Sequence, residues 1–264
     1  MPKVTSADGI SIDYDIAGSG PTLILVAGAL QHRAIDPSTQ RLIDALAKDM
    51  TVINYDRRGR GESGDTKPYA VAREIEDIEA LIDAAGTRAS LYGLSSGAVL
   101  AIEAASALAS KVDHVVAYEP PIDVEQTSSE QIWAPVKEQE DFAARGDGGG
   151  AVVAFMRQTG APPEAVEGLK QSPQWPSFAS VGHTLAYDFR LLAEVSDGGL
   201  PQHWQNATMP VLILNGDKSF AFMEAGADAV AAALPNATRK TLKGQTHDPE
   251  PEVLAPVLRQ FLTA

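Results

Sequence analysis

The chain has 264 residues, which is enough for one large domain or for a domain that carries an insertion. Its apolar fraction of 44% is ordinary for a globular protein, and its net charge of −14 argues against a nucleic-acid partner, which requires a basic face. The absence of cysteine excludes disulfides, thiolate metal sites and a cysteine nucleophile. The sequence contains no apolar run of membrane-span length and no secretory leader pattern, so we expect a cytoplasmic protein without a membrane partner.

Short apolar runs alternate with helical patterns through much of the chain. Residues 11–16 alternate apolar and polar side chains, as a half-exposed strand does. Strands buried on both faces are indicated by the short apolar runs at 22–26, 51–56, 89–92, 114–118 and 211–215, with a further strand pattern at 237–242. Helical patterns cover residues 37–48, 71–85 and 96–109. This alternation predicts a mostly parallel sheet with helices on both faces.

The regular alternation stops after Pro120 and Pro121. Residues 122–205 contain helical patches and concentrate the aromatic side chains, but they include no convincing buried strand. We expect a flexible glycine-rich break at residues 146–150 and a helix that starts at Pro163, since proline is tolerated in the first turn. The sequence therefore predicts a core formed by residues 1–121 and 206–264, and an inserted helical lid formed by residues 122–205.

The segment Gly93-Leu94-Ser95-Ser96-Gly97 is a G-x-S-x-G pentapeptide between a strand pattern and a helical pattern. In such a nucleophile elbow the serine occupies a strained turn with its hydroxyl exposed above the sheet. We expect positions 93 and 97 to require their glycines, because a Cβ there would collide with the neighbouring strand and helix. The pattern predicts Ser95 as a catalytic nucleophile, and the alternative is a structural serine in a tight turn.

A serine hydroxyl is a weak nucleophile until a base accepts its proton. Of the five histidines, His247 lies between the strand pattern at 237–242 and the final helix. A histidine that follows both the serine and the acid along the chain is typical of strand–turn–helix nucleophile elbows. This order predicts His247 as the general base, and a solvated loop histidine is the alternative.

Residues 56–63, Asp-Arg-Arg-Gly-Arg-Gly-Glu-Ser, follow the strand pattern at 51–56. They resemble the D-x-R-G-x-G-x-S segment of the α/β-hydrolase superfamily, and the resemblance extends from about residue 12 to the C-terminus. It implies the α/β-hydrolase fold and a largely structural role for this segment. We expect Arg57 and Arg58 to pair with an acid of the loop region rather than with a substrate carboxylate.

The oxyanion loop of that family is matched by Val26-Ala27-Gly28-Ala29, with Ala27 in place of the usual histidine. The resemblance implies that backbone N–H groups stabilise a tetrahedral oxyanion, so the side chain at position 27 is not essential. The expected donors are the N–H of Ser96 and an N–H at Gly28 or Ala29.

Two carboxylates are candidates for the acid of a Ser-His-acid triad. In most of the family the acid follows the strand matched here by residues 211–215, but the usual position holds Ser219, and the neighbouring acid is Asp217. Glu119 ends the strand after the elbow helix, and functional groups of open α/β sheets gather at the carboxyl ends of strands. We favour Glu119 and keep Asp217 as the alternative.

Three short segments resemble the fungal zearalenone lactonases in particular: residues 94–98 at the elbow, Glu119-Pro120-Pro121, and Pro173-Gln174-Trp175. This resemblance implies that Glu119 is the triad acid and that Trp175 contacts the substrate. His32, which follows the oxyanion loop, and Leu94, which precedes the nucleophile, are expected to line the same site.

Together these residues predict a serine hydrolase that cleaves a small apolar ester or lactone through an acyl-enzyme. We expect no metal and no organic cofactor, because the sequence lacks a dinucleotide fingerprint, a phosphate loop and a metal-spaced His or Cys cluster. The same residues leave open cofactor-free haloperoxidase or perhydrolase chemistry, C–C bond hydrolysis or lyase chemistry, and a ligand-binding role without turnover. A homodimer is compatible with the sequence.

Overall fold

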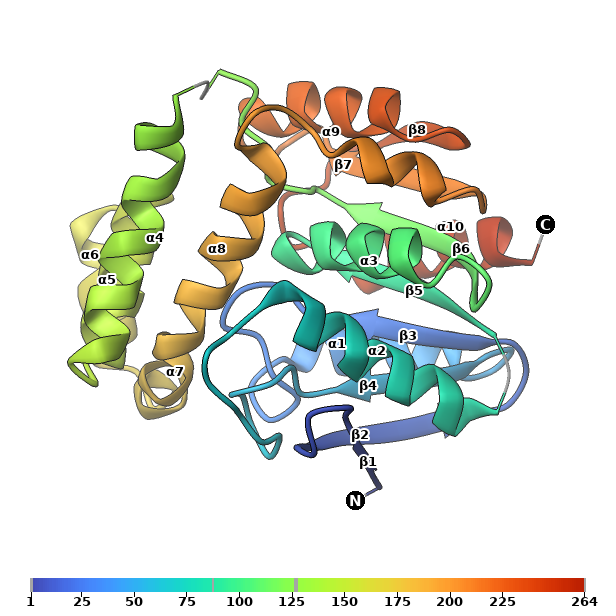
Figure 1. Ribbon diagram of the computed structural model, residues 1–264, viewed down its shortest axis with the longest axis horizontal. Coiled ribbons are helices and arrows are strands. Elements are labelled where there is room, and N and C mark those ends of the chain that lie inside the picture. Colours follow the sequence, from blue (N-terminus) through green and yellow to red (C-terminus); the bar gives the residue numbers. More distant parts are fainter. Residues whose placement is uncertain (1, 87, 126–127, 264) are drawn as a thin grey trace.

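The computed structural model describes residues 2–86, 88–125 and 128–263. Within these segments, eight strands form one sheet in the order β1-β2-β4-β3-β5-β6-β7-β8 (Figure 1). The strands are β1 (Lys3–Thr5), β2 (Ser11–Gly18), β3 (Thr22–Val26), β4 (Thr51–Tyr55), β5 (Ala89–Leu94), β6 (Val112–Tyr118), β7 (Val211–Gly216) and β8 (Ala237–Leu242). The sequence predicted all of them except β1, whose three residues are too few to produce a pattern.

Strand β2 pairs antiparallel with β1 and β4, and every pair from β4 through β3 to β8 is parallel. The expected mostly parallel sheet is therefore confirmed. In the register of the central strands, Val26 lies beside Gly93 and Leu94 lies beside Tyr118. Strands β3, β5 and β6 thus end side by side, and the loops that follow them meet at one edge of the sheet.

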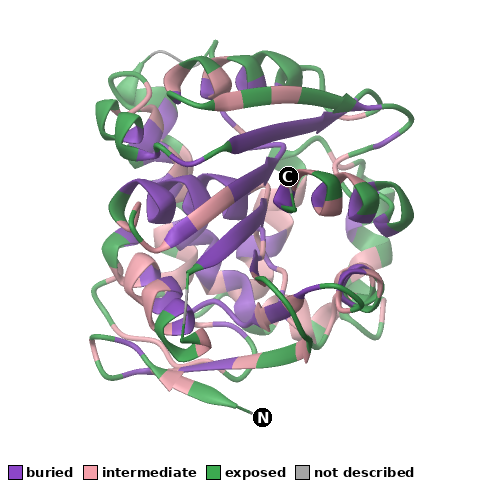
Figure 2. Cartoon of the chain, turned by 90° about the vertical axis from the view of Figure 1, so that its right-hand side faces the viewer, coloured by how far each residue is buried: buried purple, intermediate pink, exposed green. Residues whose placement is uncertain are grey.

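Two helical layers cover the sheet. The core cluster on one face includes side chains of α2 (Val71–Ala85), α3 (Ser96–Ala107) and α9 (Phe222–Ala233). The cluster on the other face includes side chains of α1 (Pro37–Leu46) and α10 (Pro251–Leu262). The central strands are buried between these layers, as the purple ribbons of Figure 2 show, which agrees with their continuously apolar sequences.

The segment between β6 and β7 is helical and stands beside the sheet (Figure 1). Its elements are α4 (Ser129–Ala144), α5 (Gly148–Gln158), α6 (Pro163–Lys170), α7 (Trp175–Val181), η1 (Gly182–Thr184), α8 (Leu185–Ser196) and η2 (Gln202–Asn206). Helix α8 packs on α3, and Trp204 of η2 is fully buried in the main core cluster. We call residues 122–205 the insertion. Its C-terminal part, which contains α8 and η2, is therefore anchored in the core.

The glycine-rich segment at 146–150 is not the flexible break that its composition suggested. Residues 148–150 form the first turn of α5, where Asp147 accepts a hydrogen bond from the N–H of Gly150 at 2.7 Å. A Cβ on Gly148 would lie 2.1 Å from the carbonyl oxygen of Ala179. Glycine is needed at position 148 because the backbones of α5 and α7 approach closely, which sequence composition does not reveal.

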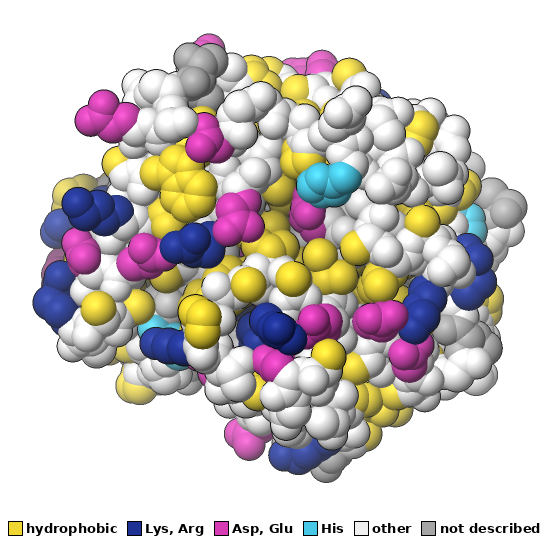
Figure 3. Space-filling view, viewed as in Figure 1, with side chains coloured by type: hydrophobic (Ala, Val, Ile, Leu, Met, Phe, Trp, Pro, Cys, Tyr) yellow, Lys and Arg dark blue, Asp and Glu magenta, His cyan; other side chains and the backbone are white. Residues whose placement is uncertain are grey.

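Charged side chains of both signs are interspersed over the face shown in Figure 3. Among the described helices, none combines the length and the apolar character that crossing a bilayer requires.

Candidate active site

Ser95 occupies a strained turn between β5 and α3, with φ 57° and ψ −126°. A left-handed φ is rare for a residue with a Cβ and marks a position that the surrounding structure enforces. A Cβ on Gly93 would lie 2.2 Å from the carbonyl oxygen of Gly97, and a Cβ on Gly97 would lie 2.2 Å from that of Val26. The predicted strand–turn–helix geometry and the need for both glycines are therefore confirmed.

Glu119 lies directly beyond β6 and is completely buried. Its carboxylate oxygen Oε2 lies 2.6 Å from Nδ1 of His247, and its Oε1 accepts the N–H of Gly216 at 2.8 Å. The Ser219 hydroxyl donates to Oε2 at 2.6 Å. Glu119 itself has a left-handed φ of 48°, so the backbone turns sharply where the strand delivers this carboxylate.

The environment of Glu119 favours its ionised form. Burial by itself would raise the pKa of this carboxyl, but the hydrogen bonds from His247, Ser219 and the Gly216 N–H outweigh burial and hold the pKa below its ordinary value. An ionised Glu119 acts as an acceptor, so it places the His247 proton on Nδ1 and leaves Nε2 as the ring nitrogen that can accept a proton.

Asp217, the alternative acid, has a different position. Its side chain is exposed, and its Oδ1 accepts the N–H of Gly244 at 2.6 Å. This contact joins the loop after β7 to the loop after β8. The structure therefore brings Glu119, and not Asp217, into hydrogen-bonding contact with His247.

Tyr118, the last residue of β6, connects the elbow to the histidine loop. Its carbonyl oxygen accepts the N–H of Ser95 at 2.9 Å, and its hydroxyl donates to the carbonyl oxygen of Thr246 at 2.5 Å. In the part of the chain that the structure describes, neither the Ser95 hydroxyl nor Nε2 of His247 has a hydrogen-bond partner. Hydrogen bonds between catalytic groups are often completed only when substrate binds.

The loop of residues 26–29, which we call the oxyanion loop, lies against the elbow, because a Cβ on Gly28 would be 3.2 Å from Cβ of Ser95. The N–H of Gly28 donates to Oε1 of Gln31 at 2.7 Å, so this donor is already engaged. Among the described residues, no acceptor faces the N–H groups of Ala29 and Ser96. Ser96 begins α3, and the first N–H groups of a helix have no acceptor within it.

The segment after β4 contributes three buried arginines, Arg57, Arg58 and Arg60. They pair with acids, as expected of Arg57 and Arg58, although most of the acids lie on helices rather than in loops. Arg57 makes two hydrogen bonds to Glu74 of α2, at 2.7 and 2.6 Å, and one to Asp188 of α8, at 2.7 Å. Arg58 makes two to Asp77 of α2, both at 2.8 Å, and one to Asp8 at 3.0 Å. Arg57 and Arg58 are each 1% exposed, so neither presents its guanidinium to solvent.

The carboxylates around Arg57 remain charged. Burial alone would raise the pKa of Asp188, but Arg60 and Arg57 outweigh it and lower the pKa below its ordinary value. Burial likewise acts against ionisation of Glu74, and Arg57 outweighs it and lowers the pKa. Two arginines and two carboxylates thus form a charge-balanced network, and we refer to Arg57, Arg60, Glu74 and Asp188 as the charge network.

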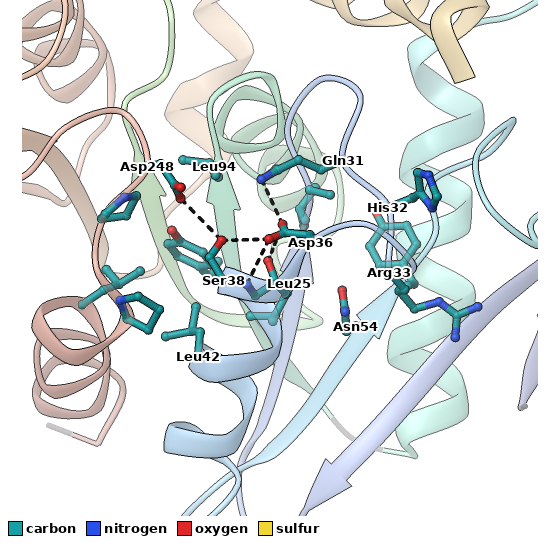
Figure 4. Close-up of a pocket in the computed structure, with 18 residues that line it drawn as sticks. Leu25, Gln31, His32, Arg33, Asp36, Ser38, Leu42, Asn54, Leu94 and Asp248 are labelled. Carbon is teal, nitrogen blue, oxygen red and sulfur yellow. Dashed lines mark hydrogen bonds between the residues drawn. The ribbon is translucent and has the colours of Figure 1, made fainter. Parts of the chain in front are cut away.

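A cavity of about 590 Å³, including the part open to solvent, is lined by chain neighbours of Ser95 and His247, but its described lining includes none of the three triad candidates (Figure 4). Leu94, which precedes the nucleophile, and Asp248, which follows His247, line one end of it. His32 lies toward the other end and is only 7% exposed. Burial lowers the pKa of His32, which favours the neutral ring. Two of the three expected substrate contacts therefore share one cavity.

Trp175, the third expected substrate contact, is half-buried in a different place. It belongs to a lid cluster that also includes Leu30 and Ala29, next to the oxyanion loop. A Cβ on Gly149 would lie 3.0 Å from its ring. That Trp175 contacts the substrate stays a prediction. It is supported by the packing of Trp175 in a cluster that also includes Ala29.

Sequence reasoning did not assign roles to Ser219, Gln31 or Asp188. Ser219 was visible only as a serine where an acid was expected, and that anomaly could have suggested support for another acid. Gln31 follows the oxyanion loop by two residues, so its contact with Gly28 is local. Asp188 carries no local signal, because its partner Ser96 is 92 residues away in sequence.

The fold agrees with comparisons to known proteins. A profile described as the alpha/beta hydrolase family matches residues 23–257. The chain therefore belongs to the alpha/beta hydrolase family.

The solved structure of an alpha/beta hydrolase from Sphaerobacter thermophilus is 39% identical, covers 99% of this chain and 100% of its own, and superimposes with a TM-score of 0.85. An enol-lactonase from Burkholderia xenovorans is 21% identical with full coverage of both chains and a TM-score of 0.75, which shows a shared fold. The uncharacterised hydrolase YraK of Bacillus subtilis is 29% identical over 116 residues. That alignment spans 42% of this chain and 42% of YraK.

Proposed function

We propose that this protein is a serine hydrolase that cleaves a carboxylic ester or lactone through an acyl-enzyme. The observation that carries the proposal is the hydrogen bond between buried Glu119 and Nδ1 of His247, beside a strained elbow that presents Ser95. A carboxylate in this position holds the imidazole in the tautomer that can accept the serine proton, and it stabilises the imidazolium that then forms.

In the proposed reaction, Oγ of Ser95 attacks the carbonyl carbon while Nε2 of His247 accepts the hydroxyl proton. The tetrahedral intermediate collapses when His247 returns this proton to the leaving alkoxide, which leaves an acyl group on Ser95. A water molecule then attacks the acyl-enzyme with His247 again acting as the base, and the acid product departs.

The proposed oxyanion donors are the N–H groups of Ala29 and Ser96. Ser96 follows Ser95 along the chain, and Ala29 follows Gly28, whose added Cβ would lie 3.2 Å from Cβ of Ser95. Neither N–H has an acceptor among the described residues, whereas the Gly28 N–H is occupied by Gln31. Fixed donors that face the developing oxyanion are often the largest single contribution to acyl-transfer catalysis.

An apolar substrate is supported by the side chains around His247. The ring of Phe220 lies 5.7 Å from the His247 ring, edge to face, and it stacks with Phe222 at 6.1 Å. These two rings are 43% and 38% exposed. Apolar surface beside a polar catalytic group is typical of sites that bind apolar ligands. A lactone is the ester class that the short resemblance to zearalenone lactonases favours.

The test is reaction of the purified protein with a fluorophosphonate, read by intact mass, with Ser95→Ala as the matched variant. We expect one adduct on the wild type and none on the variant, because phosphonylation requires an activated serine. A screen of p-nitrophenyl esters and aliphatic lactones then measures turnover. A wild type that is properly folded but forms no adduct would contradict the proposal, and would favour a ligand-binding role without turnover.

A further inference from the structure

The charge network connects the oxyanion loop with helix α8 of the insertion. Arg60 donates through Nη2 to Oδ2 of Asp188 at 2.6 Å and through Nε to the Thr184 hydroxyl at 3.1 Å. Its Nη1 donates to the carbonyl oxygen of Gly28. Arg60 and Asp188 are 1% and 2% exposed. The guanidinium is therefore held by groups of the insertion on one side and contacts the oxyanion loop on the other.

The contact with Gly28 determines where the next N–H group points. The peptide between Gly28 and Ala29 is trans, and in a planar trans peptide the carbonyl and the following N–H point in opposite directions. When the Gly28 carbonyl accepts from Arg60, the Ala29 N–H must therefore point away from the arginine. In the described part of the chain, this N–H has no other acceptor that could fix its direction.

The same carboxylate also contacts the elbow. Oδ1 of Asp188 accepts the hydroxyl of Ser96 at 2.7 Å and Nη1 of Arg57 at 2.7 Å. Nη1 of Arg57 donates in addition to the carbonyl oxygen of Ala27 at 3.1 Å. Asp188 of α8 thus contacts Ser96 at the start of α3 directly. Through Arg57 and Arg60, the same carboxylate is connected to two successive carbonyl oxygens of the oxyanion loop.

We propose, on the basis of the serine hydrolase function proposed above, that Arg60 and Asp188 are positioning residues for the oxyanion hole. The Asp188 carboxylate fixes the Arg60 guanidinium, which holds the Gly28 carbonyl and thereby directs the Ala29 N–H toward the oxyanion. Packing of α8 on α3 then sets the geometry of the hole. Neither residue touches the reacting atoms.

Two observations favour positioning over simple stabilisation. Buried ion pairs contribute little net stability, because the loss of hydration offsets the attraction between the charges. In addition, Arg57 and Arg60 stand at the variable positions of the D-x-R-G-x-G-x-S segment, whereas Arg58 stands at its arginine position. Arg58 is equally buried and pairs with Asp77 and Asp8, so the same segment offers a matched arginine without a contact to the oxyanion loop.

The experiment compares Arg60→Lys with Arg58→Lys. Lysine keeps the charge, but it cannot donate to Asp188, Thr184 and Gly28 at the same time, since it lacks the guanidinium fork. Turnover of a p-nitrophenyl ester is measured per active site, together with inhibition by a trifluoromethyl ketone whose hemiketal oxyanion with Ser95 requires the same donors. For Arg60→Lys we expect kcat to fall about 10- to 100-fold and the ketone inhibition constant to rise by a similar factor. We expect KM to change less than about twofold, because a ground-state ester makes little use of the hole.

Arg58→Lys is expected to lower the melting temperature while kcat and ketone inhibition per active site stay within about twofold of wild type. If Arg60→Lys does not fold, Asp188→Asn and the milder Thr184→Val provide the same comparison. Thr184→Val removes the acceptor of Arg60 Nε together with the hydroxyl that donates to the Val181 carbonyl oxygen. A folded variant of this set with wild-type kcat and ketone inhibition overturns the positioning role. A wild type that does not react with the fluorophosphonate overturns the proposed function instead, so the two failures are distinguishable.

Discussion

The Ser219 hydroxyl donates to Oε2 of Glu119 at 2.6 Å, the same oxygen that faces Nδ1 of His247. Ser219 occupies the place where most of the family carries its triad acid. In this chain that place holds a hydrogen-bond donor, and the carboxylate that contacts His247 belongs to Glu119, directly beyond β6. The loop after β7 therefore still contributes to the site, because it stabilises a charge that another strand supplies.

Replacement of Ser219 by alanine should destabilise the fold in a pH-dependent way. The folded pKa of Glu119 lies below its ordinary value of 4.5, so the stability gained from the ionised carboxylate is present above that value and is lost as pH falls through the folded pKa. We expect Ser219→Ala to lose about 1–2 kcal/mol of unfolding free energy at neutral pH and less at about pH 3.5. Urea unfolding at both pH values measures this difference, and an equal loss at both would contradict it.

Glu119→Gln should abolish most of the hydrolytic activity. The amide keeps the shape of the carboxylate but cannot hold His247 in the correct tautomer or stabilise the imidazolium, so we expect kcat to fall by about 10³- to 10⁴-fold. Steady-state hydrolysis of a p-nitrophenyl ester provides the measurement. Asp217→Asn is the control and should retain turnover within about twofold of wild type, because Asp217 contacts Gly244 rather than His247. The opposite pattern would assign the acid to Asp217.

The acid should be transferable to position 219. Because Ser219 already contacts the oxygen that faces His247, an aspartate there can place a carboxylate near Nδ1. We expect the double variant Glu119→Gln with Ser219→Asp to recover about 10- to 100-fold of the activity lost in Glu119→Gln alone. Glu119→Gln with Ser219→Asn has the same shape without the charge, and it should show no recovery. Equal activity of the two double variants would mean that the carboxylate at position 219 does not reach the histidine.

Trp175→Ala should change substrate selectivity rather than the chemical step. Trp175 belongs to the apolar cluster that includes Ala29, so its loss removes apolar surface near the oxyanion loop. We expect KM for long-chain esters to rise about 5- to 20-fold while KM for acetate esters stays nearly constant. Trp133→Ala is the matched control, since Trp133 donates to Asp197 and packs in a separate cluster of α4 and α8. If both variants raised KM for long-chain esters to the same extent, the effect would come from a general weakening of the insertion and not from a substrate contact of Trp175.

Much of this protein was predictable because its signals are local. The two glycines of the elbow and the short apolar strands reflect backbone sterics or burial within a few residues, and the order of Ser95 and His247 is visible directly along the chain. Local composition failed at residues 146–150. Glycine there predicted flexibility, but a close approach between α5 and α7 and the Asp147 cap produce a helix. Strand β1 was missed because three residues are too few for periodicity.

The fold class, the nucleophile and base candidates and a choice between two acids follow from the amino-acid sequence. Long-range packing was needed to show which carboxylate contacts His247, which loop N–H has no acceptor among the described residues, and that a carboxylate of α8 joins the elbow to the oxyanion loop. The contacting pairs Glu119–His247 and Arg60–Asp188 are each separated by 128 residues along the chain. Contacts at such separations depend on strand order, register and the packing of α8 on α3, which no local pattern of side chains encodes.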